Sequence, residues 1–188
     1  MGYLTKQQIA AMGFGAVGKN VLLSYRASFH NPAGITIGDN VRIDDFCVLS
    51  AGAGGIRIGS YVHIAVYTSI FGAGAVVIED FANLSSRVSI YSSSDDYSGV
   101  TMTNPMVPDQ YKAVKHAPVQ VGRHVVIGSG SVVLPGVRLA EGVAVGALSL
   151  VRDSCGPFTS WAGVPARQIG ERSRALLRLE EQLLGKTS

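Results

Sequence analysis

The sequence predicts a parallel β-helix, in which short strands wind into stacked, three-sided coils. Three observations lead to this fold class: aliphatic residues recur every six positions, 23 glycines occur among 188 residues, and turns rich in Gly, Asp or Asn separate the hexads. A strand with two or three inward positions cannot bury a core alone, so successive hexads must stack as rungs of a solenoid. A β-sandwich would show longer strands joined by hairpin turns.

The inward aliphatic residues define fifteen aligned hexads, three to a coil. They are Ile37, Ile43, Leu49, Ile58, Ile64, Ile70, Ile78, Leu84, Ile90, Val121, Ile127, Val133, Leu139, Val145 and Val151. Each follows another small or aliphatic residue two positions earlier, as strand geometry requires if both side chains point inward. The spacing extends back to Val17, Leu23 and Phe29, so we expect about six coils.

Insertions in the repeat leave from one corner of the predicted triangle. The stretches NPAG (31–34), AGAGG (51–55) and GAGA (72–75) all follow the third strand of a coil. At the same corner about 25 residues are added between Ile90 and Val121, which predicts a long loop over residues 91–117. A long excursion from a rigid scaffold is usually functional.

One helix is expected at each end of the solenoid. Thr5 and Gln8 form the pattern of a capping box, so residues 1–14 are expected to form a short helical cap that ends near Gly13. Leucines at 176, 179, 183 and 184 mark one face of a second helix, from about 170 to 184. We expect both helices to cover open coil edges; oligomerisation is the alternative role for the second. The chain is then a single domain, with the β-helix over 15–152 and a C-terminal loop and helix over 153–188.

Composition narrows the classes of function. A net charge of +3 without a run of Lys or Arg argues against nucleic acid as a partner. The N-terminus has no signal-peptide pattern, and no apolar stretch is long enough to predict membrane insertion. Cys47 and Cys155 have no metal-ligand spacing and no partner pattern, so we expect a reducing, cytoplasmic setting and no metal.

Three stretches carry a family resemblance: APVQVGRHVVIGSGSVVLPGVRL, VAVGALSLVRD and WAGVPARQI. With these motifs the chain resembles the left-handed β-helix hexapeptide-repeat acyltransferases over almost its whole length. It is most similar to bacterial sugar O-acetyltransferases of the galactoside, maltose and O-antigen type. The resemblance implies a left-handed coil, acetyl-CoA as co-substrate, and a homotrimer with the cofactor in grooves between chains.

The resemblance also implies where the cofactor binds. Gly128, Ser129 and Gly130 occupy a turn that matches Gly146 and Ala147 one coil later, and flat turns let a ligand approach backbone N–H groups. By resemblance, Ser129, Gly130 and Ala147 line the cofactor arm. Arg167 matches a basic residue near the phosphates of coenzyme A, and Arg152 is a second candidate. Turn geometry alone and solvated surface charge are the alternatives.

The acceptor side departs from the galactoside-type pattern. In those enzymes the long loop opens with a catalytic histidine, and Asp95 stands at that place here; Val126 replaces a typical tryptophan. An aspartate with an ordinary pKa of about 3.9 is a poor base for a hydroxyl, whereas a histidine near about 6.5 suits that task. His116 returns with the far end of the loop, so we hypothesise that His116 is the base and that Asp95 or Asp96 orients it or holds the acceptor.

A second group of candidates lies on the outer face of the coils. His63 points outward, with Arg42 one coil earlier and Asn83 one coil later. This column is interpreted either as a subunit contact or as an acceptor pocket, with His63 as the rival base and Arg42 and Asn83 as substrate ligands. Tyr97, in the loop, can stack on a sugar ring.

Four functions compete. The first is acetyl-CoA-dependent O-acetylation of a sugar of a cell-surface polysaccharide, such as the O-antigen of lipopolysaccharide, or its precursor. The second is N-acetylation of a nucleotide-linked amino sugar, because an amine needs less help than a hydroxyl and the acidic loop suits it. The third is a non-catalytic scaffold, against which the glycine turns and GVPARQI argue. The fourth, a carbonic-anhydrase-like zinc enzyme, requires a grouping of histidines that the four present here lack.

Overall fold

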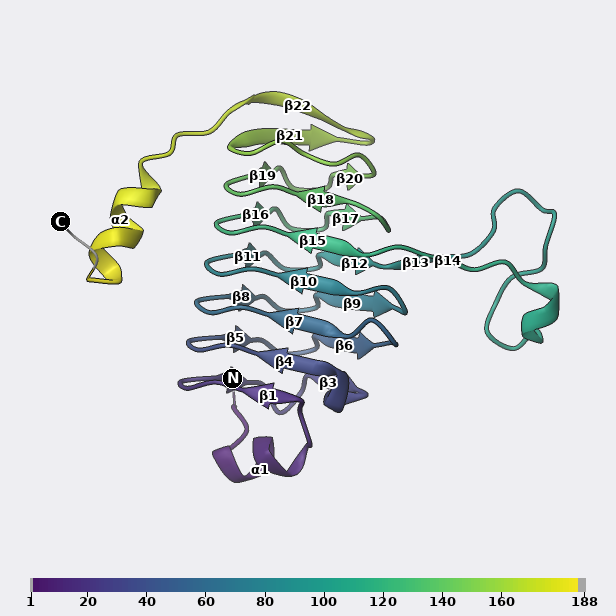
Figure 1. Cartoon of the computed structure of the whole chain (residues 1–188), viewed down its shortest axis with the longest axis horizontal. Helices are drawn as coiled ribbons and strands as arrows, with labels where there is room; N and C mark the ends of the chain where they lie inside the picture. The colour runs from purple at the N-terminus through teal and green to yellow at the C-terminus, as the bar shows by residue number, and fades with distance from the viewer. Residues whose placement is uncertain (1, 186–188) are drawn as a thin grey trace.

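The computed structural model describes residues 2–185. Three sheets, parallel except where β22 joins the second, form the faces of an elongated prism (Figure 1). The first face holds β1 (Ala16–Val17), β4 (Ile35–Ile37), β7 (Ile56–Ile58), β10 (Val76–Ile78), β15 (Val119–Val121) and β18 (Arg138–Leu139). The second holds β2 (Leu22–Leu23), β5 (Arg42–Ile43), β8 (His63–Ile64), β11 (Asn83–Leu84), β16 (Val126–Ile127), β19 (Ala144–Val145), β21 (Thr159–Gly163) and β22 (Ala166–Glu171). The third holds β3 (Ser28–His30), β6 (Val48–Ala51), β9 (Ser69–Gly72), β12 (Ser89–Tyr91), β17 (Val132–Val133) and β20 (Leu150–Val151).

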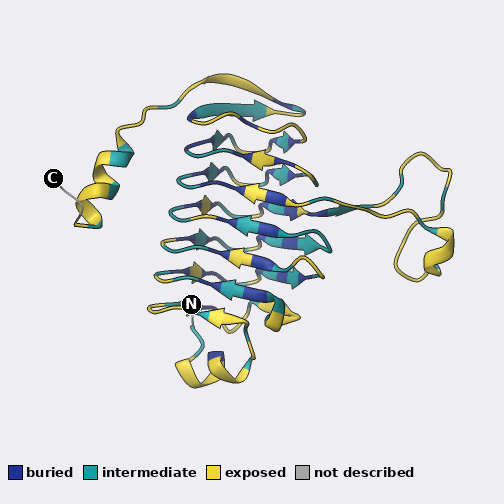
Figure 2. Cartoon of the chain, viewed as in Figure 1, coloured by how far each residue is buried: buried dark blue, intermediate teal, exposed yellow. Residues whose placement is uncertain are grey.

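The core is a set of aliphatic columns along the prism axis. On the second face Ile43, Ile64 and Leu84 stand in register on successive strands, and each is fully buried. All fifteen predicted inward positions are buried, and Figure 2 shows them as dark blue positions that alternate with intermediate or exposed ones along the strands. The solenoid prediction is confirmed, with six complete coils and β21 as the start of a seventh.

The turns stack into three edges, of which two carry regular columns of side chains. The first edge joins the first face to the second, and the second edge joins the second face to the third. Left-handed backbone occurs at matching turn positions, for example at Tyr61 and Phe81 on the first edge and at Phe46 and Tyr67 on the second. Because this conformation costs a non-glycine residue about 1–2 kcal/mol, coil-to-coil hydrogen bonds must hold it in place.

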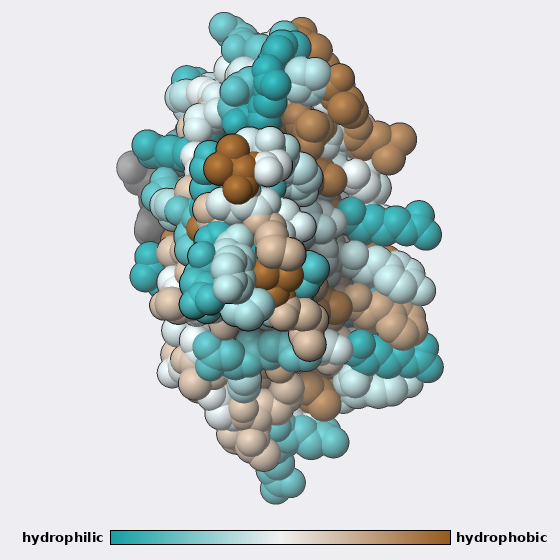
Figure 3. Space-filling view, turned by 90° about the vertical axis from the view of Figure 1, so that its right-hand side faces the viewer, coloured by the Kyte–Doolittle hydropathy of each residue, from teal (hydrophilic) through white to brown (hydrophobic). Residues whose placement is uncertain are grey.

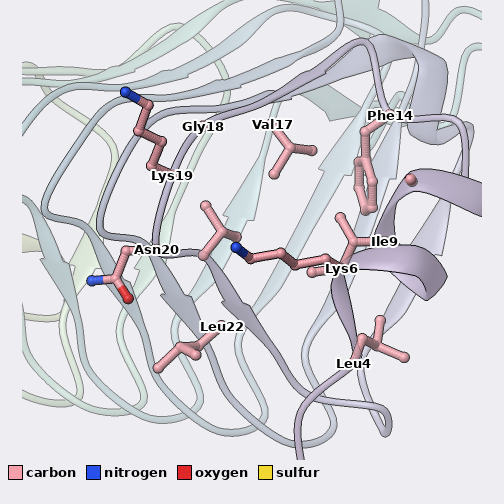
Figure 4. Close-up of a pocket in the computed structure, with 11 residues that line it drawn as sticks. Leu4, Lys6, Ile9, Phe14, Val17, Gly18, Lys19, Asn20 and Leu22 are labelled. Atoms are coloured by element: carbon pink, nitrogen blue, oxygen red, sulfur yellow. The ribbon is translucent and has the colours of Figure 1, made fainter.

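Helix α1 (Lys6–Ala11) closes the N-terminal end as predicted. Thr5 and Gln8 form both hydrogen bonds of the capping box, and Ile9 is buried against the first coil. The helix does not fill this end completely. A pocket of about 610 Å³ remains, lined by apolar side chains such as Phe14 and Val17, with Lys6 and Lys19 among the residues around it (Figure 4).

The C-terminal prediction is partly wrong. The second helix, α2 (Leu176–Leu183), begins at 176 rather than near 170, because β22 folds back antiparallel on β21 after a cis peptide bond at Pro165. This hairpin, and not the helix, covers the last coil. Helix α2 instead stands beside the prism (Figure 1), where Glu180 binds Arg123 and His124 on the first edge.

The third edge, which joins the third face to the first face of the next coil, is called the third corner. The long loop leaves from it, as do the short insertions that follow β3, β6 and β9. A short 3-10 helix, η1 (Pro32–Gly34), lies in the first of these insertions. Two short antiparallel strands, β13 (Ser93–Ser94) and β14 (Lys115–His116), form the base of the loop, and η2 (Asp109–Tyr111) lies near its tip. We call residues 91–117 the arm, because they extend away from the prism (Figure 1). No helix in residues 2–185 is long and apolar enough to cross a membrane.

Candidate functional site

The second edge brings the predicted cofactor residues together. The N–H of Leu148 donates to the carbonyl of Ser129 at 2.9 Å, and the N–H of Gly130 donates to the carbonyl of Ser86 at 2.9 Å. Ser86, Ser129 and Ala147 therefore occupy the same turn position on three successive coils. The hydroxyls of Ser86 and Ser129 lie 3.2 Å apart, and Ser129 and Ala147 are exposed. The predicted stacking of Ser129 and Ala147 is present.

Gly130 makes a notch in this edge. The turn positions on either side of it carry exposed side chains, Arg87 on the preceding coil and Leu148 on the next. A Cβ built on Gly130 would lie 2.7 Å from Cδ2 of Leu148, and the backbone there has φ +72°, which favours glycine. The notch is thus a position without a side chain, which the side chain of Leu148 approaches and beside which lie the hydroxyls of Ser86 and Ser129.

Two of the predicted cations converge at the C-terminal end. Asp153 lies 3.2 Å from a guanidinium nitrogen of Arg167 and 3.6 Å from one of Arg152. Both arginines are exposed, so each keeps donors that face solvent. Such a pair can hold a phosphate group.

The column of Arg42, His63 and Asn83 contains a further residue, Asp44, which was not among the predicted candidates and which contacts both Arg42 and His63. Asp44 is 4% exposed; its carboxylate accepts from Nε of Arg42 at 2.7 Å and lies 2.9 Å from Nε2 of His63. Burial opposes ionisation of Asp44, but the hydrogen bonds from Arg42 and His63 outweigh it and hold the pKa of the carboxyl below its usual value.

The His63 ring has both nitrogens engaged. Nδ1 lies 3.2 Å from the side-chain amide of Asn83. Both partners are oxygen atoms, Oδ2 of Asp44 at Nε2 and Oδ1 of Asn83 at Nδ1, so the ring is the donor in these contacts. In this arrangement neither nitrogen is free to take a proton from a substrate.

The arm separates its candidate residues. Nδ1 of His116 lies 2.7 Å from the hydroxyl of Ser93, its cross-strand neighbour, and that hydroxyl accepts from the N–H of Ala73. The predicted orienting contact between His116 and an aspartate is absent from residues 2–185, and serine takes that place. Asp95 is exposed, and within the same range its carboxylate makes no hydrogen bond or ion pair.

Asp96 belongs to the framework of the arm. Its carboxylate accepts from the N–H of Ser98 at 2.9 Å, and from the N–H and hydroxyl of Thr101 at 3.1 and 2.9 Å. These hydrogen bonds, those from Ser98 first, hold the pKa of Asp96 well below its usual range. Tyr97 beside it is 92% exposed.

In one chain the arm and the notch do not face each other. Ser86 precedes β12 and Ser93 follows it, so the two groups lie at opposite ends of the third-face strand. The arm also points away from the prism (Figure 1). Within residues 2–185 no cluster of three or more His, Cys, Asp or Glu side chains could hold a metal ion.

Comparison with known proteins gives the family. The chain is 57% identical over 180 residues to dTDP-4-amino-4,6-dideoxy-D-glucose acyltransferase of Escherichia coli, covering 96% of this chain and 94% of the relative. This chain belongs to the hexapeptide-repeat acyltransferases. The predicted family and the enzyme class are thereby confirmed, although no protein-family model matches the chain.

The solved structures agree with this membership. An aspartate variant of AntD, an N-acyltransferase from Bacillus cereus, in complex with dTDP and coenzyme A, matches with a TM-score of 0.95 and 44% identity over all of both chains. This match confirms the predicted fold class. Other AntD structures carry substitutions at a serine ten residues before that aspartate, and two of them hold dTDP-4-amino-4,6-dideoxyglucose with coenzyme A.

The first-ranked function of the sequence analysis has weaker support than its alternative. The putative lipopolysaccharide biosynthesis O-acetyl transferase WbbJ of Escherichia coli K12 is 31% identical over 115 residues, which is 61% of this acyltransferase and 56% of WbbJ. The two relatives described above, which are 57% and 44% identical to this chain, are named as an acyltransferase of an amino sugar nucleotide and as an N-acyltransferase. The comparisons therefore favour N-acyl transfer over the O-acetylation ranked first.

Proposed function

We propose that this enzyme transfers an acyl group from acyl-CoA to the amino group of a dTDP-linked 4-amino-4,6-dideoxyhexose. The observation that carries the proposal is the 57% identity, over 96% of the chain, to an acyltransferase for that sugar nucleotide. Phosphorylated donors and acceptors of this kind are handled inside the cell, which supports the cytoplasmic location.

The acidic arm suits an amine acceptor. The amine nitrogen attacks the thioester carbonyl carbon, the C–S bond breaks, and coenzyme A leaves as a thiol after taking up the proton that the amine gives up. A carboxylate such as Asp95 binds an ammonium group and receives its proton more readily than one from a hydroxyl, because the ammonium is the stronger acid.

The spacing of Ser and Asp supports the assignment to Asp95. AntD was studied with substitutions at a serine and an aspartate ten positions apart. In this chain Ser85 and Asp95 have that spacing, as do Ser86 and Asp96. Since Asp96 is engaged by its own loop, we assign the acceptor-binding carboxylate to Asp95 and keep His116 as the rival base.

The site needs a second copy of the chain, in keeping with the predicted homotrimer. The arm exposes Tyr97, Val100 and Met106, each at least 85% accessible, which is costly unless a partner covers them. The arm and the notch lie at opposite ends of β12, so Asp95 of one chain reaches a notch only on its neighbour.

The test measures thiol release from acetyl-CoA with two acceptors that differ in one group, dTDP-4-amino-4,6-dideoxyglucose and its 4-hydroxy counterpart. We expect turnover with the amine and none with the alcohol. Asp95→Asn is expected to lower kcat at least tenfold, and His116→Ala to change it less. Preference for the alcohol, or for free sugars, would refute the proposed function; a larger loss in His116→Ala would reassign the base.

A further inference from the structure

The second edge continues beyond the notch as a ladder of exposed side chains. Toward the N-terminus from Gly130, the same turn position carries Arg87, Tyr67, Phe46 and Arg26, joined by coil-to-coil hydrogen bonds. The rings of Phe46 and Tyr67 stack with centroids 5.0 Å apart. The guanidinium of Arg26 lies over Phe46 and that of Arg87 over Tyr67. Figure 3 shows a column of side chains projecting from one edge of the prism, with more and less hydrophilic groups in alternation.

The arginines at the two ends of the ladder differ in whether a carboxylate compensates their positive charge. Arg26 lies 3.9 Å from the carboxylate of Asp45 and donates to the hydroxyl of Tyr25 at 2.9 Å. Arg87 is exposed and makes no ion pair with any group in residues 2–185. An uncompensated guanidinium, steadied by an aromatic ring and placed one coil from the notch, is suited to bind an anionic group of a ligand.

The distance of each cation from the notch indicates which of the two substrates it binds. Arg152 and Arg167 lie toward the C-terminal end, beyond Leu148, whereas Arg87 is adjacent to the notch. In an acyl-CoA the thioester is separated from the phosphates by the whole pantetheine chain. In a 4-amino nucleotide sugar the amine is separated from the diphosphate by one pyranose ring. The adjacent cation therefore matches the acceptor and the distant pair matches the donor.

We propose, on the basis of the proposed function, that Arg87 binds the diphosphate of the acceptor and that Tyr67 and Phe46 contact its base. The notch and Phe46 are three coils apart, or about 14 Å at about 4.8 Å per coil, which is the reach of an extended nucleotide sugar. Each ring covers a face of the other, so the rings present their edges outward. A planar base then packs edge-to-face against them, a favoured aromatic geometry. The donor and acceptor meet end to end at Ser86 and Ser129.

The test uses substitutions that the left-handed backbone accepts. Arg87 and Tyr67 have φ values of +61° and +63°, and asparagine is the side chain best tolerated there. Tyr61→Asn is a matched control, because Tyr61 has φ +58° and stacks on Phe81 at 4.9 Å, but on the first edge. Arg57→Gln, on the first face, controls for the loss of one positive charge. Circular dichroism checks that each variant is folded.

Calorimetry with dTDP, thymidine and coenzyme A distinguishes the outcomes. We expect Arg87→Asn to weaken dTDP binding at least tenfold and to leave thymidine and coenzyme A unchanged, with Arg87→Lys intermediate. Tyr67→Asn is expected to weaken dTDP and thymidine alike, by about threefold or more. Wild-type affinity for dTDP in Arg87→Asn, or a loss confined to coenzyme A, overturns the assignment.

The proposed function can fail separately. If the wild-type enzyme turns over the amino sugar and Arg87→Asn has an unchanged KM for it, the ladder is wrong and the activity stands. If no amino sugar is a substrate and Arg87→Asn still loses dTDP, the ladder is a nucleotide site and the acceptor has been misassigned.

Discussion

Replacing Gly130 with alanine tests whether the notch admits the donor. The added Cβ would lie 2.7 Å from Cδ2 of Leu148, and the backbone at φ +72° disfavours any side chain. We expect alanine in this conformation to lower the free energy of unfolding by about 1–2 kcal/mol. The methyl group also occupies the gap in which the pantetheine arm is proposed to lie.

Two further variants separate strain from obstruction. Gly136 has φ +84°, and a Cβ there would meet only the Cβ of Ala117 at 3.5 Å, so Gly136→Ala carries the backbone cost without a clash at the notch. The double variant Gly130→Ala/Leu148→Ala removes the side chain that the methyl group strikes. Urea unfolding at one protein concentration gives the stability of each, and calorimetry gives its dissociation constant for coenzyme A.

Obstruction predicts a distinct pattern. Gly130→Ala and the double variant should bind coenzyme A at least tenfold more weakly, equivalent to about 1.4 kcal/mol, while Gly136→Ala should bind it normally. If the double variant regains wild-type affinity, the loss came from displacement of Leu148 and not from a filled notch. Unchanged affinity in Gly130→Ala itself would place the donor elsewhere on the prism.

Other perturbations test the remaining features of the fold. Asp44→Asn should lower the free energy of unfolding by about 1–3 kcal/mol at pH 7. Because the pKa of this carboxyl lies below its ordinary 3.8 in the folded chain, the difference should persist above pH 4 and shrink as the pH falls through the folded pKa; equal urea midpoints at pH 7 would refute it. Glu180→Gln should loosen α2, seen as faster amide hydrogen exchange over 176–183, and unaltered exchange would mean that the pairing with His124 does not anchor the helix. Burial raises the pKa of the Cys47 thiol to about 11, so it should resist thiol reagents at pH 8 until the chain unfolds, and prompt labelling of the native protein would contradict this. Ile64→Asp should prevent folding, since it places an unpaired charge in a fully buried column; soluble, folded protein would disprove the core assignment.

The core could be predicted from the sequence because each inward position obeys a local rule. Six-residue spacing fixes Ile43, Ile64 and Leu84 without knowledge of any distant contact, and the capping box of α1 depends only on Thr5 and Gln8. The C-terminal hairpin was missed for the opposite reason. Pairing of β22 with β21 depends on a turn at Pro165 and on the open end of the last coil, neither of which has a periodic signal.

The site was predicted unevenly. The stacking of Ser129 and Ala147 could be predicted because glycine-rich turns stand out against the repeat, and their role at the cofactor stays a prediction. The ladder was missed because Phe46, Tyr67 and Arg87 occupy turn positions where glycine or asparagine is usual, and hydrophobic patterning ignores such positions. Their recurrence about every twenty residues was a usable signal. Asp44 was missed because its burial depends on two side chains from different coils, which one hexad read alone does not show.

Insertions at the third corner change the length of the chain without changing the solenoid. Short insertions and the arm all leave the solenoid there, and the rungs before and after each one stay in register, as β12 and β17 do across the arm. Lengthening, shortening or exchanging that segment therefore disturbs neither the hydrophobic columns nor the edge that carries the notch. A lineage built this way can rewrite one appendage while the rest of the solenoid is inherited intact.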